Sequence, residues 1–415
     1  MSELPGAGTA AQLGPDWSPW PARILGHADP LKIDHQTGTH RIISPEMTWQ
    51  AIQPLLQPAG ITRVADLTWL DDLGIPTVQA VRPASLTLSV SQGKATTYRA
   101  AQVSAVMESL ENWHAENITA DLTRTATTEL GPELTYDPAA LNRPAGSLYH
   151  PGAKLDWMIA TTLLTGRRTW VPWLATVVNV SVSDAWGPPM FGMDTTGLAS
   201  GNSYHEATLH ALYEIMERHA MATATAGSTL FGVPLEDAMQ STCAQLFDLV
   251  HSAGSSLQIA RIDVWDGFYC FAAELSSPMM QVPFSGSGLH HDPNVALSRA
   301  ITEAAQSRLT AISGAREDLP TAIYQRFARM HTYAPANRAM QSMPDAAPTP
   351  WHTEYTNSLP DLLAAAASAV AAVTGTEPLA VVCDFPAACI PVVKAIAPGL
   401  AASIQSPMRT PLQEA

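Results

Sequence analysis

Residues 207–217 of the chain, ATLHALYEIME, carry two alanines four positions apart and, after them, two glutamates three positions apart. Residues 101–111, AQVSAVMESLE, repeat this spacing, and residues 296–306, ALSRAITEAAQ, repeat it with glutamine in place of the last acid. Each stretch is a helix by propensity, and its alanines allow close approach to a sheet. The recurrence of A-x3-A-x2-E-x2-[EQ] indicates an internal duplication or a shared structural demand.

The acids of these three stretches occupy equivalent positions, and Arg218, Arg299 and Arg308 lie on the same predicted helices. One Glu-Glu pair at this spacing is most often a solvated helix face. Three pairs in register favour a different interpretation, because Mg²⁺ takes carboxylate oxygens together with substrate phosphates and arginine binds phosphate through two parallel N–H groups. The chain has neither a Walker A loop nor a Rossmann fingerprint, so the residues predict a Mg²⁺-nucleotide site without a P-loop.

Composition excludes several classes of protein. Of the 415 residues, 46% are hydrophobic and only 14% are charged, which is typical of a large packed core. The formal net charge of −15 argues against nucleic acid as a partner. The four cysteines form no C-x-x-C pair and are expected in the core. Without a signal peptide or an apolar run long enough to span a bilayer, the protein is expected in the cytoplasm and away from membranes.

Local signals predict one large α+β domain. Ser44-Pro45 begins a helix that continues over residues 47–56, and the alternation over residues 85–91 predicts a strand. The Asp-Gly turn after Trp265 predicts a hairpin of residues 257–264 and 268–275. A second hairpin and a further helix are expected over residues 157–164 with 169–182, and 362–373.

The histidines offer a competing site. His290-His291-Asp292 has the composition of a metal-binding triplet, but Asp292-Pro293 is also a helix N-cap followed by proline, and we favour this structural role. His205, His210 and His219 do not share one helical face, so a zinc hydrolase is not favoured.

Three stretches of the chain resemble the conserved blocks of the YcaO family: SVSQGKATTYRAAQVSAVMESLENWHAE (89–116), GLASGNSYHEATLHALYEIMERHA (197–220) and GSGLHHDPNVALSRAITEAAQSRLTAISGAREDL (286–319). The similarity extends from about Gly60 to Gly399 and ends in VVKAIAPGL. It implies the YcaO fold, with antiparallel sheets flanked by helices, and activation of backbone amides of ribosomally made peptides with ATP and Mg²⁺.

The resemblance also assigns residues. By the family's motifs, the implied nucleotide contacts are Ser91, Lys94, Ser104, Asn202, Glu206, Arg218, Arg299, Glu303, Gln306 and Arg308. The implied Mg²⁺ ligands, which the repeated E-x-x-E spacing also favours, are Glu108, Glu111, Glu214 and Glu217. No protein nucleophile is assigned.

The chain departs from the family pattern at several positions. Ala95 replaces a second glycine, so the loop over residues 91–95 either shifts until nucleotide binds or holds Ala95 in an ordinary conformation. His219 follows Arg218, where the family often has an acid. The ending SPMRTPLQEA lacks the Pro-x-Pro-x-Pro tail of partner-dependent azoline-forming members, which favours a stand-alone enzyme.

Four segments follow from these observations. We expect a loose arm over residues 1–20, an extension packed on the domain over 21–59, the YcaO ATP-binding domain over 60–400, and a tail over 401–415.

The expected reaction is O-phosphorylation of a peptide amide in a ribosomal precursor peptide, as in pathways that resemble bottromycin biosynthesis. The nucleophile comes from the substrate and gives an azoline or a macrocyclic amidine. The alternatives are thioamide formation with a TfuA-type partner and a non-catalytic peptide-binding relative. A homodimer is a further expectation for the assembly.

Overall fold

Each of the three acid-bearing stretches forms a helix that directly follows a strand. The computed structural model describes residues 32–36, 38–179, 190–224, 228–278, 280–319, 343–352, 354–383 and 390–401. The predicted arm, most of the predicted tail and Cys389 lie outside the described residues. The three strand–helix units are β3 (Val90–Lys94) with α3 (Tyr98–Asn117), β7 (Leu198–Ser200) with α5 (Tyr204–Thr223), and β11 (Met280–His290) with α8 (Pro293–Ser313).

The start of each helix is fixed by its N-cap. The side chains of Thr97, Ser203 and Asp292 accept hydrogen bonds from backbone N–H groups in the first turns of α3, α5 and α8. Such a cap satisfies one of the donors that a helix start leaves without an intrahelical partner. The predicted N-cap role of Asp292 is thereby confirmed.

The strands of the described residues form three antiparallel sheets, and antiparallel sheets were predicted. β3 is an edge strand of a three-stranded sheet, and β11 is an edge strand of a four-stranded sheet. β7 lies at one end of a six-stranded sheet in which β6 pairs with β5. The remaining strands are β1 (Arg63–Asp66), β2 (Thr77–Val81), β4 (Leu122–Ala126), β5 (Lys154–Thr162), β6 (Arg168–Pro172), β8 (Leu230–Gly232), β9 (Ser256–Ile262), β10 (Tyr269–Ser277), β12 (Leu379–Val382) and β13 (Val392–Ile396).

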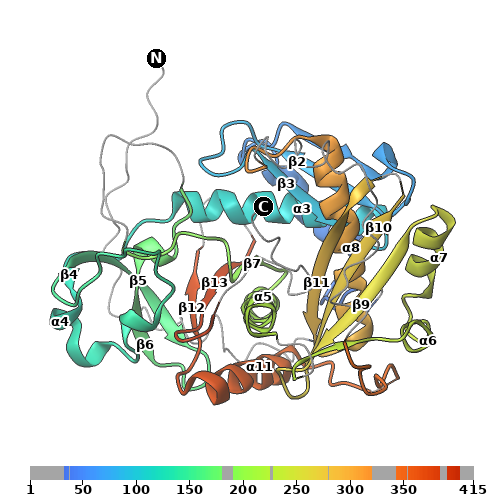
Figure 1. Ribbon diagram of the computed structural model, residues 1–415. Coiled ribbons are helices and arrows are strands. Elements are labelled where there is room, and N and C mark those ends of the chain that lie inside the picture. The colour runs from blue at the N-terminus through green and yellow to red at the C-terminus, as the bar shows by residue number, and fades with distance from the viewer. Residues whose placement is uncertain are drawn as a thin grey trace.

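Figure 1 shows how helices join these sheets. α5, seen end-on near the centre, lies between the sheet of β12, β13 and β7 and the sheet of β9 to β11, and it contacts β7, β13 and β11. α3 packs on β2 and β3, and α8 packs along β10 and β11. The other α-helices of the described part of the chain are α2 (Pro45–Ile52), α4 (Thr127–Leu130), α6 (Leu235–Ala238), α7 (Ala244–Ser252) and α11 (Leu359–Thr374), and α11 packs on α5.

Glycines and alanines bring the strands and helices of each unit together. The alanines of the repeated spacing on α3, α5 and α8 are fully buried. A Cβ on Gly93 would collide with the backbone of Ala101 and Ala105, and a Cβ on Gly286 would collide with the backbone of Ala300 and Ala304. The close approach predicted from the alanines is therefore observed. It also requires a glycine on the facing strand, where a Cβ would collide with the helix backbone.

Most predicted elements are confirmed, with changed bounds. β9 and β10 form the hairpin across Asp266-Gly267, and β5 and β6 form the second hairpin. β6 ends at Pro172, because proline has no N–H to continue the ladder, so residues 173–179 of the predicted strand are not part of it. Residues 180–182 of that prediction lie outside the described residues. α2 likewise ends at Ile52, just before a short 3₁₀ turn that contains Pro54. α11 confirms the predicted helix over 362–373.

The strand predicted over residues 85–91 is wrong, because only Val90 and Ser91 belong to a strand. The hydroxyls of Ser85 and Thr87 instead donate hydrogen bonds to Glu116 Oε1, at 2.8 and 2.9 Å, and the guanidinium of Arg82 binds both carboxylate oxygens of Glu116 at 2.6 Å. The alternating hydroxyls satisfy a buried carboxylate rather than face solvent from a sheet.

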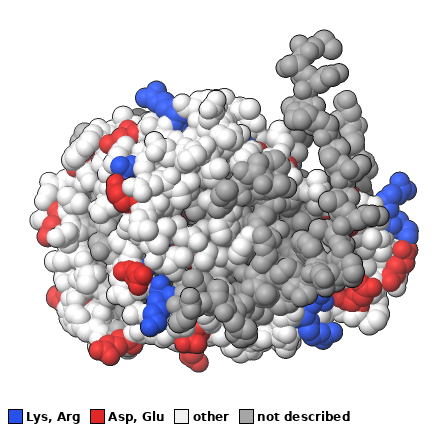
Figure 2. Space-filling view, turned by 180° about the vertical axis from the view of Figure 1, so that it is seen from behind, with Lys and Arg blue, Asp and Glu red and all other residues white. Residues whose placement is uncertain are grey.

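Two composition-based expectations are tested in the described residues. Cys243, Cys270 and Cys383 are buried, as predicted. None of the described helices has both the length and the apolarity that a bilayer crossing requires. On the face shown in Figure 2, described Lys and Arg side chains stand singly or beside acids and form no continuous basic field.

The glycine contacts give the first prediction. Gly286→Ala should lower the free energy of unfolding by about 1–3 kcal/mol, because the new methyl group has to displace the backbone of α8. Gly232→Ala is the matched control, since its Cβ meets nothing closer than 3.9 Å, and its effect should stay within about 0.5 kcal/mol. Chemical denaturation of both variants measures the difference, and equal stabilities would contradict the packing described.

Candidate functional site

The four glutamates of the E-x-x-E pairs come together from α3 and α5. On each helix the first glutamate bonds to its own unit: Glu108 Oε2 accepts the N–H of Gln92 on β3 at 3.2 Å, and Glu214 Oε2 accepts the N–H of Gly197, next to β7, at 3.1 Å. These bonds fix Oε2 of each carboxylate and leave Oε1 outside the strand contacts.

The second residue of each pair bonds to the strand of the next unit. Glu111 on α3 accepts from the N–H and the hydroxyl of Ser200 on β7, at 2.7 and 2.6 Å. Glu217 on α5 accepts from the hydroxyl of Ser287 and the N–H of Leu289 on β11, at 2.6 and 3.1 Å. Gln306 on α8 donates to the carbonyl of Gln92 on β3 at 3.0 Å, so the three units close into a ring.

The ring explains the exception in the repeat. The partner of Gln306 is a carbonyl oxygen, which requires a donor, whereas Glu111 and Glu217 face N–H and hydroxyl donors. An amide supplies that donor and a carboxylate does not.

Burial makes three of the glutamates, Glu108, Glu111 and Glu214, costly to ionise. Burial is the main cause that raises the pKa of Glu111 to about 8; the neighbouring charges of Glu108 and Glu214 add to it, and the hydrogen bonds from Ser200 oppose it. Burial is also the main cause that raises the pKa of Glu108 and of Glu214. Neighbouring carboxylates that disfavour one another's charge form a binding place for a divalent cation.

Basic side chains from all three units border this acidic cluster. Lys94 Nζ lies 3.0 Å from Glu303 Oε2, and a guanidinium nitrogen of Arg218 lies 3.5 Å from Glu214 Oε1. Burial alone would raise the pKa of Glu303, but Lys94, Arg218 and Arg299 together hold it below its ordinary value. The Nε atoms of Arg218 and Arg299 are buried without a hydrogen-bond partner, and phosphate oxygens would satisfy both.

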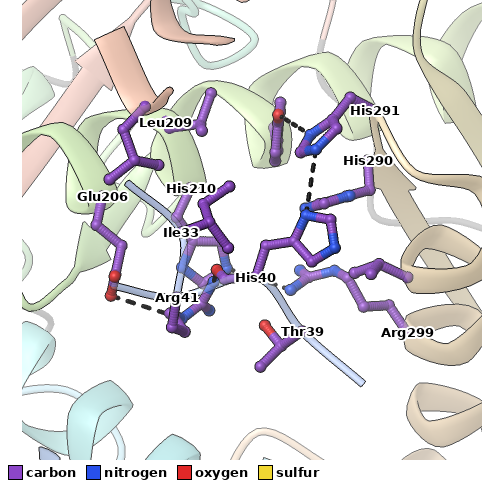
Figure 3. Close-up of a pocket in the computed structure, with 13 residues that line it drawn as sticks. Ile33, Thr39, His40, Arg41, Glu206, Leu209, His210, His290, His291 and Arg299 are labelled. Atoms are coloured by element: carbon purple, nitrogen blue, oxygen red, sulfur yellow. Dashed lines mark hydrogen bonds and ion pairs between the residues drawn. The ribbon is translucent and has the colours of Figure 1, made fainter. Parts of the chain in front are cut away.

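Asn202 and Glu206 join the site to the segment before α2. Glu206 Oε1 accepts from the N–H and the side-chain amide of Asn202, at 3.1 and 2.9 Å, and its Oε2 accepts the N–H of Ile42 at 2.9 Å. Arg41 Nε lies 3.6 Å from the same carboxylate (Figure 3). Thr48 donates to Asn202 Oδ1 at 3.0 Å.

The remaining predicted contacts lie around β3 and α8. Ser91 is buried on β3, 3.5 Å from the side-chain amide of Asn112, and Ser104 lies on the face of α3 that Gly93 contacts. Arg308 is different, because its guanidinium is buried against two aspartates, Asp71 at 3.2 Å and Asp72 at 2.9 Å.

The altered loop needs no glycine at Ala95. Arg124 is the only described residue other than glycine with a positive φ, so Ala95 adopts an ordinary conformation. β3 continues through Lys94, whose amine already reaches Glu303. The ordinary conformation of Ala95 agrees with the second alternative for this loop.

Sequence reasoning missed several residues of the site. The acids of the site are held by hydrogen bonds from three strand residues, Ser200, Ser287 and Gln92. The sequence signal that could have identified these residues is their position just before each helix. Lys394 is buried on β13 with Nζ 2.5 Å from the carbonyl of Asp194, and its charge lowers the pKa of Glu214. Arg41 carries no motif that could have identified it.

Comparison with known proteins agrees with this architecture. The family model of the YcaO cyclodehydratases, described as ATP- and Mg²⁺-binding, matches residues 92–401. The chain belongs to the YcaO family. ATP and Mg²⁺ are therefore its cofactors, and the buried acids with their bordering cations fit both.

Individual relatives extend the comparison. An uncharacterised protein of Mycobacterium tuberculosis is 68% identical over 410 residues, which cover 99% of this chain and 93% of that protein. An uncharacterised protein in the tfuA 3′ region of Rhizobium leguminosarum bv. trifolii is 37% identical over 312 residues, covering 70% of this chain and 71% of the relative. The structure of YcaO from Methanopyrus kandleri bound with AMPPCP and Mg²⁺ matches with a TM-score of 0.66 at 21% identity, covering 89% of this chain and 95% of that one, and supports the predicted fold.

The raised pKa of Glu111 predicts how stability depends on pH. Between its ordinary pKa of 4.5 and about 8, the folded protein keeps a proton that the unfolded chain releases. Stability of the protein without nucleotide or metal should therefore fall as the pH rises through this range. Thermal unfolding from about pH 6 to 9 should show a shallower fall for Glu111→Gln, and Mg²⁺ should stabilise the unmodified protein more at the higher pH.

The control for this experiment is Glu236→Gln, an exposed glutamate on α6. It should keep the pH dependence of the unmodified protein. The assignment fails if Glu111→Gln and Glu236→Gln give the same slope.

Proposed function

We propose that the chain uses ATP and Mg²⁺ to phosphorylate the carbonyl oxygen of a peptide backbone amide, and that the activated amide closes to an azoline or a macrocyclic amidine. The observation that carries this proposal is the meeting of four glutamates from α3 and α5, one buried and three half-buried, with Lys94, Arg218 and Arg299. Such a site suits phosphoryl transfer, which depends mostly on positioning and charge neutralisation.

The acidic and basic halves of the site have separate proposed roles. Glu108, Glu111 and Glu214 hold Mg²⁺ through the oxygen that their strand contacts leave available. Glu217, both of whose oxygens accept hydrogen bonds from β11, contributes a remaining lone pair. The proposed nucleotide contacts are Ser91, Lys94, Ser104, Asn202, Glu206, Arg218, Arg299, Glu303 and Gln306. Arg308 can contact the nucleotide only if its guanidinium releases Asp71 or Asp72 and binds a phosphate group instead.

The chemistry requires an activated leaving group. An amide oxygen leaves poorly, and ATP supplies the phosphoryl group that converts it into phosphate. A nucleophile of the substrate adds to the carbonyl carbon, the resulting oxyanion takes the phosphoryl group, and the carbon–oxygen bond then breaks. A cysteine thiol gives an azoline and an N-terminal amine gives a cyclic amidine, each with net loss of water from the peptide.

A second outcome, thioamide formation, is favoured by the relative from the tfuA 3′ region. There the nucleophile is sulfide, which replaces the carbonyl oxygen, and a TfuA-type protein is the proposed partner. The activation step and its residues stay the same. A non-catalytic peptide-binding role is disfavoured, because a scaffold has no need for three neighbouring glutamates, Glu108, Glu111 and Glu214, whose burial opposes their charge.

Mass spectrometry of precursor peptides incubated with the pure protein, ATP and Mg²⁺ tests the proposal. Loss of water indicates a ring, and replacement of oxygen by sulfur, with a sulfide source and TfuA-type protein added, indicates a thioamide. Glu214→Gln should reduce turnover by at least about 100-fold, because it removes a charge that balances the metal. The exposed variant Glu236→Gln should keep full activity.

Circular dichroism has to show that Glu214→Gln is folded before its activity is compared. Full ATP-dependent activity of that folded variant would contradict the metal assignment. Peptide modification that is independent of ATP would contradict the proposed reaction as a whole.

A further inference from the structure

A histidine from the segment before α2 meets the two histidines at the end of β11. Among the described residues, His40, His290 and His291 form a group in which one nitrogen of each side chain lies within 4.8 Å of the others. His40 Nδ1 lies 3.2 Å from His291 Nε2, and the ring centroids of His290 and His291 are 4.1 Å apart. Figure 3 shows the three side chains gathered at one side of a pocket.

The distal nitrogens of two of these rings are oriented by oxygen atoms. His291 Nδ1 lies 2.7 Å from the Tyr213 hydroxyl, and His40 Nε2 lies 3.4 Å from Asp292 Oδ2. A metal-bound imidazole uses one nitrogen for the ion and typically donates the other N–H to an oxygen, which fixes the ring. His40 and His291 have this arrangement, with their two remaining nitrogens facing each other.

The spacing suits a small tetrahedral ion. Zn–N bonds of about 2.0–2.1 Å place two imidazole nitrogens roughly 3.3 Å apart in a tetrahedral site. The separation of 3.2 Å between His40 and His291 matches this geometry. His290 has to adjust, because its Nδ1 accepts the N–H of Asp292 at 3.0 Å and its ring has to turn to become the third ligand.

The surroundings also leave room for a fourth ligand. A cavity of about 20 Å³ adjoins the histidines and is bordered by Thr39 and Arg299, enough space for one water-sized molecule. Arg41 and Arg299 oppose a cation there, while the carboxylates of Asp292 and Glu206 offset them. Imidazole donors favour zinc-class ions over Mg²⁺, which prefers oxygen.

We propose that His40, His290 and His291 bind one zinc-class divalent ion, separate from the carboxylate Mg²⁺ site, and that this ion ties the segment before α2 to β11 beside α5. The proposal does not rest on the proposed function. The competing interpretation is a metal-free chain of hydrogen bonds from Tyr213 through His291 and His40 to Asp292, which satisfies the same nitrogens with protons.

The experiment uses the full chain, stripped with a chelator and titrated with Co²⁺ in excess Mg²⁺. The visible absorption of tetrahedral Co²⁺ should saturate at one equivalent, and Zn²⁺ should displace it. His40→Ala and His291→Ala should weaken binding by more than about 100-fold, and Tyr213→Phe by roughly tenfold through loss of its support for His291.

Two controls separate this site from others. His251→Ala, at an exposed position on α7, should bind Co²⁺ like the unmodified protein. Glu111→Gln should also keep the Co²⁺ signal, because it alters only the carboxylate site, so failure of the proposed function and failure of this site are distinguishable.

The proposal is overturned if the unmodified protein gives no saturable signal, which is the outcome that the hydrogen-bond chain predicts. Unchanged binding by His40→Ala overturns it equally. If His291→Ala does not fold, His40→Gln decides the question, because His40 lies on the segment before α2 and outside the central helices and sheets.

Discussion

The hydrogen bond from the second residue of each repeated pair to the strand of the next unit holds the site together. Glu111 reaches β7, Glu217 reaches β11 and Gln306 reaches β3, so every helix is tied to two strands. These bonds form only if helix and strand backbones approach closely, which the buried alanines and Gly93 and Gly286 permit. Packing and chemistry thus depend on the same contacts, and a methyl group at Gly93 or Gly286 would disturb both.

The ring gives the site two electrostatic halves. α3 and α5 contribute four glutamates, three of which have raised pKa values caused mainly by burial. α8 contributes Glu303, which Lys94, Arg218 and Arg299 keep ionised against burial. The first half favours a cation and the second carries cationic groups that can meet phosphate, so one arrangement serves both parts of a magnesium nucleotide.

Much of this was predictable from sequence because the repeat is local. Spacing on a helix fixes which side chains share a face, so the acids of α3 and α5 could be grouped before the structure was known. The anchoring by Ser200 and Ser287 could not, because it depends on which strand lies beside which helix. The strand predicted over residues 85–91 failed for a related reason: its hydroxyls serve Glu116, a partner about 30 residues away whose position no periodicity reveals.

Contacts between distant segments explain the histidine cluster as well. His290-His291-Asp292 alone supports the N-cap interpretation, and Asp292 does cap α8. His40 changes the chemistry of that triplet, since it adds a third imidazole from a position 251 residues away from His291. The N-cap and the metal site are compatible, because Asp292 uses Oδ1 for Asn294 and Oδ2 for His40. One carboxylate therefore fixes the start of the helix and orients the proposed ligand, which places the segment before α2 against the same helix that carries Arg299 and Glu303.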